Sequence, residues 1–355
     1  MVRSQVVPTS RLAVHCQIAG PDDAPVVVLV HGNISTGRFF NNVIEALARS
    51  YRVIAPDMRG FGDSEAPPID ATRGLRDFSE DLHALLAALH IERPVHLVGW
   101  SVGGGVVLQF AVDHPQQVAS LVLEAPMSPY GFGGTKDLQG TPCHDDFAGS
   151  GGGTANPEFV RLLAAGDRDV ASQTSPRNVL RGCIIHPGNG VTGVDEDGYL
   201  TELLKTRVGD DHYPGDLQAS ANWPGVAPGA RGMNNAISPK YIDLKGFAGI
   251  DPKPPVLWIR GDKDVIVSDT SLFDFGFLGQ LGAVPGWPGN DVCPPQPMVG
   301  QMRALLDAYR DRGGSYEELV LPDTGHSPHL ERPTEYVAAL EKFFAASSAP
   351  PAAAS

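Results

Sequence analysis

The apolar positions of the chain fall into short continuous runs, separated by segments with helical spacing. Runs that predict strands lie near 11–18, 26–31, 51–56, 95–100, 118–124, 255–261 and 315–321. Segments that predict helices lie near 36–49, 75–90, 102–114 and 333–346. The run from Val26 to Val30 is apolar at every position, which is typical of a strand buried on both faces of a parallel sheet. This alternation predicts a wound α/β sheet covered by helices, with a ligand site beyond the carboxyl ends of its strands.

Two stretches rich in Gly and Pro interrupt the alternation. The longer one, 133–251, is too long for a single loop and contains apolar anchors, so we expect a cap or lid over the site. Short helices are expected within it at Pro157–Ala165 and Tyr199–Arg207. A second insertion covers about 270–297. Its aromatic residues are expected to pack on the cap and to wall an apolar pocket; they are Phe273, Phe275, Phe277 and Trp287.

Length and charge narrow the class of protein. A chain of 355 residues accommodates one large core, expected over 1–132 and 252–346, followed by a disordered tail over 347–355. The net charge is −14 and the sequence contains no basic cluster or nucleotide-binding glycine motif, so nucleic acid is not an expected partner. We also expect no signal peptide and no membrane span, since no apolar stretch approaches ~20 residues.

The four cysteines show no paired spacing; they are Cys16, Cys143, Cys183 and Cys293. We interpret them as reduced thiols of a cytoplasmic protein, with a Cys143–Cys183 bridge inside the cap as the alternative. The metal-binding residue types do not follow a spacing typical of zinc sites. The sequence therefore predicts neither a metal nor an organic cofactor.

The strongest chemical signal is Gly99-Trp100-Ser101-Val102-Gly103, where an apolar run turns into a helix. Small residues two positions on either side of a serine permit a cramped strand–turn–helix that lifts the hydroxyl clear of the sheet. The same turn places the next backbone N–H beside the hydroxyl. We therefore predict that Ser101 is a nucleophile.

A general base is expected on a loop late in the chain. The strand ending near Leu321 is followed by Gly325-His326, and a helix begins near Pro333. A histidine on such a loop can reach a serine on a neighbouring strand, take its proton and return it to the leaving group. We predict that His326 has this role, and we interpret the competing His329 as a packing residue.

The third member of a triad must orient the imidazole. Asp264 lies just beyond the strand 255–261, and the order Ser101, Asp264, His326 is the order of α/β-hydrolase triads. Asp262 is the local competitor and is interpreted as a turn residue. Glu124, at the end of the strand after the elbow helix, is the alternative acid.

An oxyanion site is expected from the loop after the strand 26–31, which ends in His31-Gly32-Asn33. The backbone N–H of Asn33 could pair with that of Val102 to hold a developing oxyanion. Ile34 is the competing donor. We interpret His31 as a residue that shapes this loop by hydrogen bonds and transfers no proton.

On the basis of these motifs, the chain resembles the α/β-hydrolase fold superfamily over about 10–132 and 252–346. The matching motifs are His31-Gly32-Asn33, Asp57-Met58-Arg59-Gly60-Phe61-Gly62-Asp63-Ser64, Gly99-Trp100-Ser101-Val102-Gly103-Gly104, Gly261-Asp262-Lys263-Asp264 and Gly325-His326. The resemblance implies an eight-stranded, mostly parallel sheet flanked by helices. It also implies a serine nucleophile, because dehalogenases and epoxide hydrolases of this fold carry Asp at the elbow.

The sequence thus predicts a capped serine hydrolase, most readily a carboxylic-ester or lactone hydrolase acting on an apolar small-molecule substrate. The same triad fits carbon–carbon bond hydrolysis, thioester cleavage and perhydrolysis. The alternative of another class is a ligand-binding receptor that retains the fold and turns over little.

Overall fold

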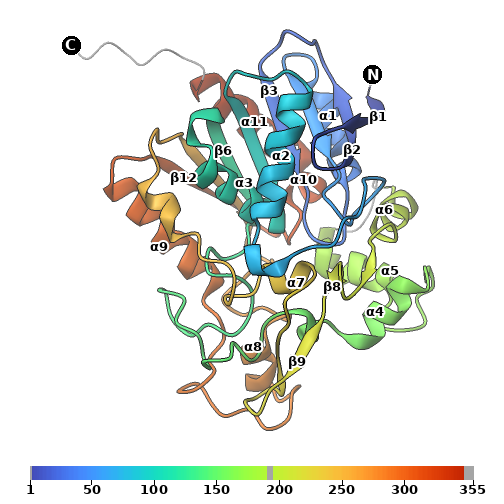
Figure 1. Ribbon diagram of the computed structural model, residues 1–355, viewed down its shortest axis with the longest axis vertical. Helices are drawn as coiled ribbons and strands as arrows, with labels where there is room; N and C mark the ends of the chain where they lie inside the picture. The colour runs from blue at the N-terminus through green and yellow to red at the C-terminus, as the bar shows by residue number, and fades with distance from the viewer. Residues whose placement is uncertain (1, 190–194, 348–355) are drawn as a thin grey trace.

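An eight-stranded sheet organises the structure, a computed structural model that describes residues 2–189 and 195–347 (Figure 1). In sheet order the strands are β1 (Arg3–Pro8), β2 (Ala13–Ala19), β4 (Arg52–Pro56), β3 (Val26–Val30), β5 (Val95–Trp100), β6 (Val118–Glu124), β11 (Val256–Gly261) and β12 (Tyr316–Leu321). β1 pairs antiparallel with β2, and β2 pairs antiparallel with β4. All pairs from β4 to β12 are parallel, as the sequence predicted.

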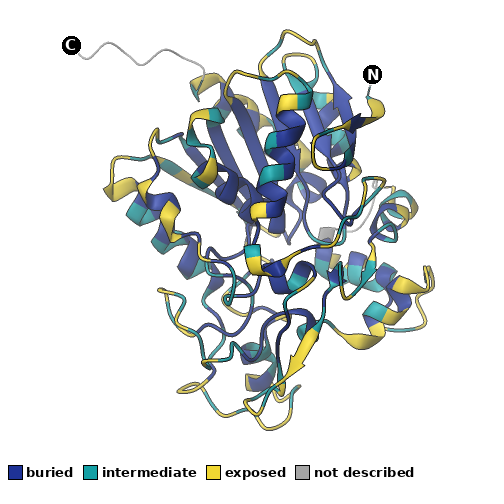
Figure 2. Cartoon of the chain, in the orientation of Figure 1, coloured by how far each residue is buried: buried dark blue, intermediate teal, exposed yellow. Residues whose placement is uncertain are grey.

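Each face of the sheet packs against its own layer of helices. The helices α2 (Arg76–Ala88), α3 (Val102–Asp113) and α9 (Met298–Asp311) contribute to one hydrophobic core, and α1 (Asn41–Leu47) and α11 (Pro333–Ser347) to the other. Along β3, Val28 faces the first core, while Val27 and Leu29 face the second. The fully buried strands in Figure 2 therefore explain why their sequences are continuously apolar.

β1 was not predicted from the sequence, because its side chains are mostly exposed. Only Val7 of this strand is buried, so the segment shows no apolar run. It forms by antiparallel pairing with β2 at the edge of the sheet, from Arg3 opposite Ile18 to Pro8 opposite Ala13. Backbone pairing, which a hydrophobic pattern does not record, accounts for this strand.

The segment 133–251 contributes no strand to the main sheet within its described part. Most of it lies at the end of the molecule opposite the chain termini (Figure 1), whereas its last helix, η7 (Lys245–Gly249), packs against α3 and α9. Its elements are η4 (Gly152–Thr154), α4 (Pro157–Ala164), α5 (Pro176–Val179), η5 (Leu180–Ile184), η6 (Pro187–Asn189), α6 (Glu196–Leu203), β7 (Val208–Gly209), β8 (Tyr213–Pro214), β9 (Leu217–Ala219), β10 (Val226–Pro228), α7 (Met233–Ala236) and η7 (Lys245–Gly249). The remaining short helices are η1 (Gly37–Phe40), η2 (Ala71–Arg73), η3 (Pro115–Gln117), α8 (Phe275–Gln280) and α10 (Pro328–Glu331).

Two predicted helices differ from the helices of the structure. The helix expected at Tyr199–Arg207 is α6, which begins at Glu196 because the Asp195 side chain caps it by accepting a hydrogen bond from the Gly198 N–H. The segment expected as one helix over 36–49 is divided into η1 and α1.

The two insertions pack against each other, as expected, through Trp223. Its indole lies nearly perpendicular to the Phe275 ring, with 6.1 Å between centroids, and donates a hydrogen bond to the Pro285 carbonyl at 2.9 Å. A Cβ placed on Gly279 would lie 2.5 Å from the Trp287 ring and 2.9 Å from Trp223. Phe273 is not buried there as expected, since 39% of its surface is exposed.

The C-terminal helix α11 includes Ser347, which had been assigned to a disordered tail, and the rest of that tail, 348–355, lies outside the described residues. Within 2–189 and 195–347, none of the helices combines the length and apolar character that crossing a membrane requires.

Candidate active site

Ser101 lies on a strained turn between β5 and α3. Its backbone has φ 56° and ψ −119°, a conformation that is costly for a residue with a side chain. The glycines around it are required by space: a Cβ on Gly99 would lie 2.3 Å from the Gly103 carbonyl oxygen, and a Cβ on Gly103 would lie 2.2 Å from the Val30 carbonyl oxygen. The geometry is therefore the strand–turn–helix predicted from the G-x-S-x-G sequence.

Backbone hydrogen bonds hold this turn against β6. The Ser101 N–H donates to the Glu124 carbonyl at 2.9 Å, and the Ser101 carbonyl accepts from the Met127 N–H at 3.1 Å. The side-chain hydroxyl of Ser101 forms no hydrogen bond with a described residue, and the residue is 8% exposed. The main chain of Ser101 is thus fixed while its hydroxyl is left without a protein partner in that part of the chain.

The predicted oxyanion loop lies directly beside Ser101. A Cβ on Gly32 would lie 3.0 Å from the Ser101 Cβ, so the loop and the elbow are in close approach. The backbone amides of Asn33 and Val102 donate no hydrogen bond to any described residue. The competing Ile34 amide donates to the Asn33 side-chain oxygen at 3.1 Å, so it is engaged locally.

His31 shapes this loop, as the sequence suggested. Its Nε2 accepts a hydrogen bond from the Met58 N–H at 2.9 Å, and its Nδ1 lies 2.7 Å from the Gly32 carbonyl oxygen. Burial lowers the pKa of His31, which keeps the ring neutral. A neutral ring that donates through Nδ1 and accepts through Nε2 satisfies both hydrogen bonds.

His326 and Asp264 form a hydrogen-bonded pair at the ends of β12 and β11. The His326 Nδ1 lies 2.8 Å from the Asp264 Oδ2. The Asp264 Oδ1 accepts from the Ile266 and Val267 amides at 2.8 and 3.0 Å, which fixes the carboxylate. The His326 carbonyl accepts from the Trp100 indole N–H at 2.8 Å, so the loop is fastened to the residue before Ser101.

Glu124 and His329, the alternative acid and the competing base, form a second pair. The Glu124 Oε1 lies 2.7 Å from the His329 Nδ1 and accepts from the His329 N–H at 2.9 Å. The Glu124 Oε2 accepts from the Tyr336 hydroxyl at 2.8 Å. Burial, together with this carboxylate, raises the pKa of Tyr336, which therefore stays a donor. The structure places Glu124 against His329 and not against His326.

Two contacts of the site were not anticipated from the sequence. The Asn33 side-chain amide donates to the Asn234 side-chain oxygen at 3.1 Å, which links the predicted oxyanion loop to helix α7 of the segment 133–251. The Ser327 hydroxyl donates to the Ile184 carbonyl at 2.6 Å, which links the histidine loop to another part of that segment. No motif marks Asn234 or Ile184, since both lie in an irregular region, so only the fold could reveal them.

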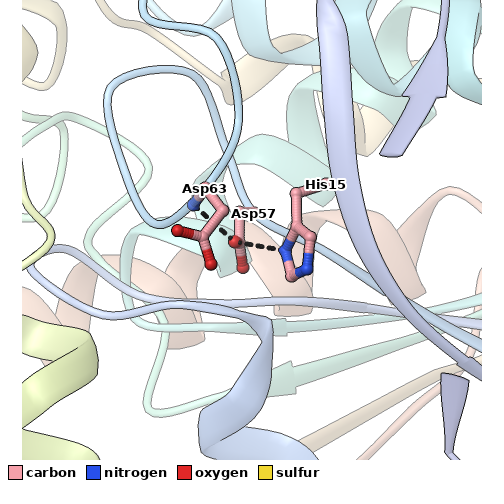
Figure 3. A group of neighbouring side chains, drawn as sticks. All are labelled: His15, Asp57 and Asp63. Carbon is pink, nitrogen blue, oxygen red and sulfur yellow. Dashed lines mark hydrogen bonds and ion pairs between the residues drawn. The ribbon is translucent and has the colours of Figure 1, made fainter. Parts of the chain in front are cut away.

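Three potential metal ligands lie close together: His15 of β2, and Asp57 and Asp63 of the motif Asp57 to Ser64 (Figure 3). Its ligand atoms already have protein partners. The His15 Nδ1 and Nε2 lie 2.7 Å from the Asp57 Oδ2 and the Ser4 Oγ, and the Asp63 Oδ2 lies 2.6 Å from the Lys205 ammonium. The hydrogen bond to Asp57, opposed by burial, raises the pKa of His15. The group therefore works as a hydrogen-bond network that shapes the loop.

Comparison with known proteins agrees with this architecture. The sequence model of a family described as "alpha/beta hydrolase fold" matches residues 25–147. The chain is 35% identical over 127 residues to the 2-hydroxy-6-oxo-6-phenylhexa-2,4-dienoate hydrolase of Burkholderia cepacia, covering 35% of this chain and 42% of that one. It is 40% identical over 96 residues to the magnesium-chelatase 30 kDa subunit of Rhodobacter capsulatus, covering 27% and 33%. The alignments thus span less than half the length of these relatives.

Solved structures match over nearly the whole chain. The esterase RhEst1 from Rhodococcus aligns with a TM-score of 0.59 at 18% identity, covering 98% of this chain and 99% of that one. The carboxylesterase CesB from Bacillus subtilis aligns with a TM-score of 0.58 at 16% identity, covering 98% and 92%. At such low identities, the similarity establishes a shared fold.

Proposed function

We propose, on the premise that the chain belongs to the α/β-hydrolase fold superfamily, that it is a serine hydrolase that cleaves a carboxylic ester or lactone. The observation that carries the proposal is the Ser101 elbow. A serine held at φ 56° is costly to maintain, and this one has a hydroxyl with no partner among the described residues. With the Asn33 and Val102 amides also unengaged in that part of the chain, the arrangement is suited to nucleophilic attack. The Asp264–His326 pair supports the proposal because it supplies an oriented imidazole on the adjoining loop.

In this mechanism the Ser101 Oγ attacks the acyl carbon while the His326 Nε2 takes the hydroxyl proton. The Asp264 carboxylate accepts the His326 Nδ1–H and stabilises the imidazolium that forms. The amides of Asn33 and Val102 donate to the oxyanion of the tetrahedral intermediate. His326 then protonates the leaving alkoxide, and a water molecule, deprotonated by His326, releases the acid from Ser101.

Hydrolysis of a carbon–carbon bond by the same residues is the second candidate. The similarity to the Burkholderia cepacia hydrolase, which extends over 127 residues, favours it. Both reactions need the same nucleophile and base. They differ in the groups that the cap presents to the leaving fragment.

The decisive experiment treats the full chain with a fluorophosphonate probe and screens it against esters, lactones, thioesters and a ring-fission dienoate. We expect the wild-type protein to be labelled on Ser101 and Ser101→Ala to lose at least about three decades of kcat together with the label. Ser120→Ala, which removes another buried serine hydroxyl from the neighbouring strand, is the control and should keep both. A folded wild-type protein that neither labels nor turns over any substrate would support the ligand-binding receptor instead.

A further inference from the structure

One carboxylate holds the main chain on both sides of His326. The Glu331 Oε2 accepts a hydrogen bond from the Gly325 N–H at 2.8 Å, and its Oε1 accepts from the Ser327 N–H at 3.3 Å. These two amides belong to the residues immediately before and after the histidine. Glu331 is 9% exposed, so water competes little for hydrogen bonds that the negative charge of the acceptor already strengthens.

The other contacts of this loop are made by different kinds of atoms. The His326 carbonyl accepts from the Trp100 indole N–H at 2.8 Å, and the Ser327 hydroxyl donates to the Ile184 carbonyl at 2.6 Å. These contacts hold one carbonyl and one hydroxyl. Glu331 holds the backbone N–H groups, so it fixes the direction in which the Cα–Cβ bond of His326 leaves the chain.

The loop also has little space in which to move. A Cβ on Gly325 would lie 3.0 Å from the Glu331 Oε1 and 2.9 Å from the Cβ of His186, which comes from a distant part of the chain. The Glu331 N–H donates to the Ser327 carbonyl at 3.0 Å, within the short helix α10. One helical turn therefore returns the carboxylate to the loop that it holds.

A buried carboxylate that accepts from two backbone amides can also be a stability feature alone. Asp274 offers that comparison within the same chain. Its Oδ2 accepts from the Phe277 N–H at 3.2 Å and from the Gln296 N–H at 2.9 Å, and the residue is 2% exposed. Neither amide flanks His326, so Asp274 is a matched control with the same chemistry and similar burial.

We propose that Glu331 is a positioning residue of the serine hydrolase proposed above, on which this inference rests. By holding both amides that flank His326, it orients the imidazole so that the Nε2 can meet the Ser101 hydroxyl. A catalytic group misplaced by about 1 Å can cost about 10²-fold in rate. Glu331 acts through His326 and not on the substrate, so its substitution should lower kcat and leave KM nearly unchanged.

The test compares the full-length wild type with Glu331→Gln and Asp274→Asn. In Glu331→Gln the remaining oxygen can accept from one amide, but the new NH2 group cannot accept from the other. On one ester that the wild type hydrolyses, well below the melting midpoints, kcat per folded molecule should fall by about ten- to a hundredfold with KM within about twofold. Asp274→Asn should lose thermal stability and keep its kcat.

Two further readouts do not depend on activity. Hydrogen exchange of peptides covering 325–327 should be faster in Glu331→Gln and unchanged in Asp274→Asn. The downfield proton NMR signal of the hydrogen bond between His326 and Asp264 should shift or broaden in Glu331→Gln alone, because the ring has lost its fixed orientation. If the glutamine variant does not fold, Glu331→Asp, which keeps both acceptor oxygens on a shorter side chain, is measured in the same way.

The outcomes separate this inference from the proposed function. An active wild type whose folded Glu331→Gln variant keeps its kcat and its NMR signal would overturn the positioning role and leave the serine mechanism intact. Equal losses of kcat in Glu331→Gln and Asp274→Asn would reduce Glu331 to a stabilising residue and also overturn it. A wild type that hydrolyses no substrate would contradict the proposed function, and the exchange and NMR measurements would still decide whether Glu331 orients His326.

Discussion

Two histidines of one short segment, His326 and His329, each pair with a carboxylate, and the two pairs differ in their surroundings. His326 pairs with Asp264 beside the serine elbow, and His329 pairs with Glu124 beneath it, with Trp100 in contact with both rings at 5.7 and 4.9 Å between centroids. His329 and Glu124 are completely buried. The His329 Nε2 has no hydrogen-bond partner among the described residues, and the ring packs 4.6 Å from that of Phe40.

The comparison teaches that a histidine–acid pair is not by itself a sign of catalysis. Glu124 accepts three hydrogen bonds, from the His329 amide, the His329 ring and the Tyr336 hydroxyl, so its oxygens anchor α10 and α11 to β6. On the proposed function, the Asp264–His326 pair performs chemistry and the Glu124–His329 pair supports the fold. Substitutions of each acid by its amide test that division.

The largest effect is expected from Asp264→Asn. The amide can no longer accept the His326 Nδ1–H in the required tautomer, so kcat should fall by roughly three to four decades. The thermal midpoint should stay within a few degrees of the wild type, because the side-chain oxygen can still accept from the Ile266 and Val267 amides. Steady-state kinetics and melting curves on the same preparation measure both, and near-normal turnover would remove Asp264 from the triad.

Glu124→Gln should have the reverse effect to Asp264→Asn: a large loss of stability and a small loss of turnover. Removing the charge from a completely buried, three-fold hydrogen-bonded carboxylate should lower the free energy of unfolding by roughly 3–5 kcal/mol. Turnover per folded molecule should stay within about tenfold of the wild type. Chemical denaturation and active-site titration give the two quantities. If this variant stayed folded and lost activity as severely as Asp264→Asn, Glu124 would be the catalytic acid.

A third buried histidine, His96, extends the comparison because its hydrogen-bond partner is a neutral hydroxyl. The His96 Nδ1 lies 2.8 Å from the Ser120 hydroxyl, and burial lowers the pKa of His96 to about 4. Between the ordinary histidine pKa of about 6.5 and pH 4, the unfolded chain binds a proton that the folded chain does not, so stability falls as the pH falls.

The expected contribution of His96 is a loss of at most about 3 kcal/mol between pH 7 and pH 4. His96→Gln can keep a hydrogen bond to Ser120 without titrating, so it should lose less stability over the same range. Denaturation at a series of pH values compares the two proteins, which share every other titratable group. Parallel stability curves for the variant and the wild type would contradict the assignment.

The sequence was sufficient to predict local structure wherever that structure depends on neighbours along the chain. The apolar run of β3 and the glycines around Ser101 record burial on two faces and a cramped turn, and both are found in the structure. Polar partners from distant segments leave no such record. Tyr336 reaches Glu124 from the last helix, and its hydroxyl shows no pattern along the chain.

The two insertions show the same limit of prediction from sequence. Their aromatic content predicted that they would meet, and Trp223 and Phe275 do meet. Their irregular backbone could not predict which individual residues would touch. Phe273 is therefore exposed against expectation.

The hydrogen bond between Asn33 and Asn234 has a consequence for protein engineering. The residue whose backbone amide is proposed to bind the oxyanion is held through its side chain by Asn234 of the segment 133–251. That segment is consequently not an exchangeable module that can be grafted from a relative to change substrate range. A chimera that replaces α7 without a side-chain acceptor at position 234 would leave the Asn33 amide group unpartnered and its loop free to shift. An attempt to change specificity in this protein should therefore preserve the Asn33–Asn234 contact first and alter other residues of the segment 133–251 afterwards.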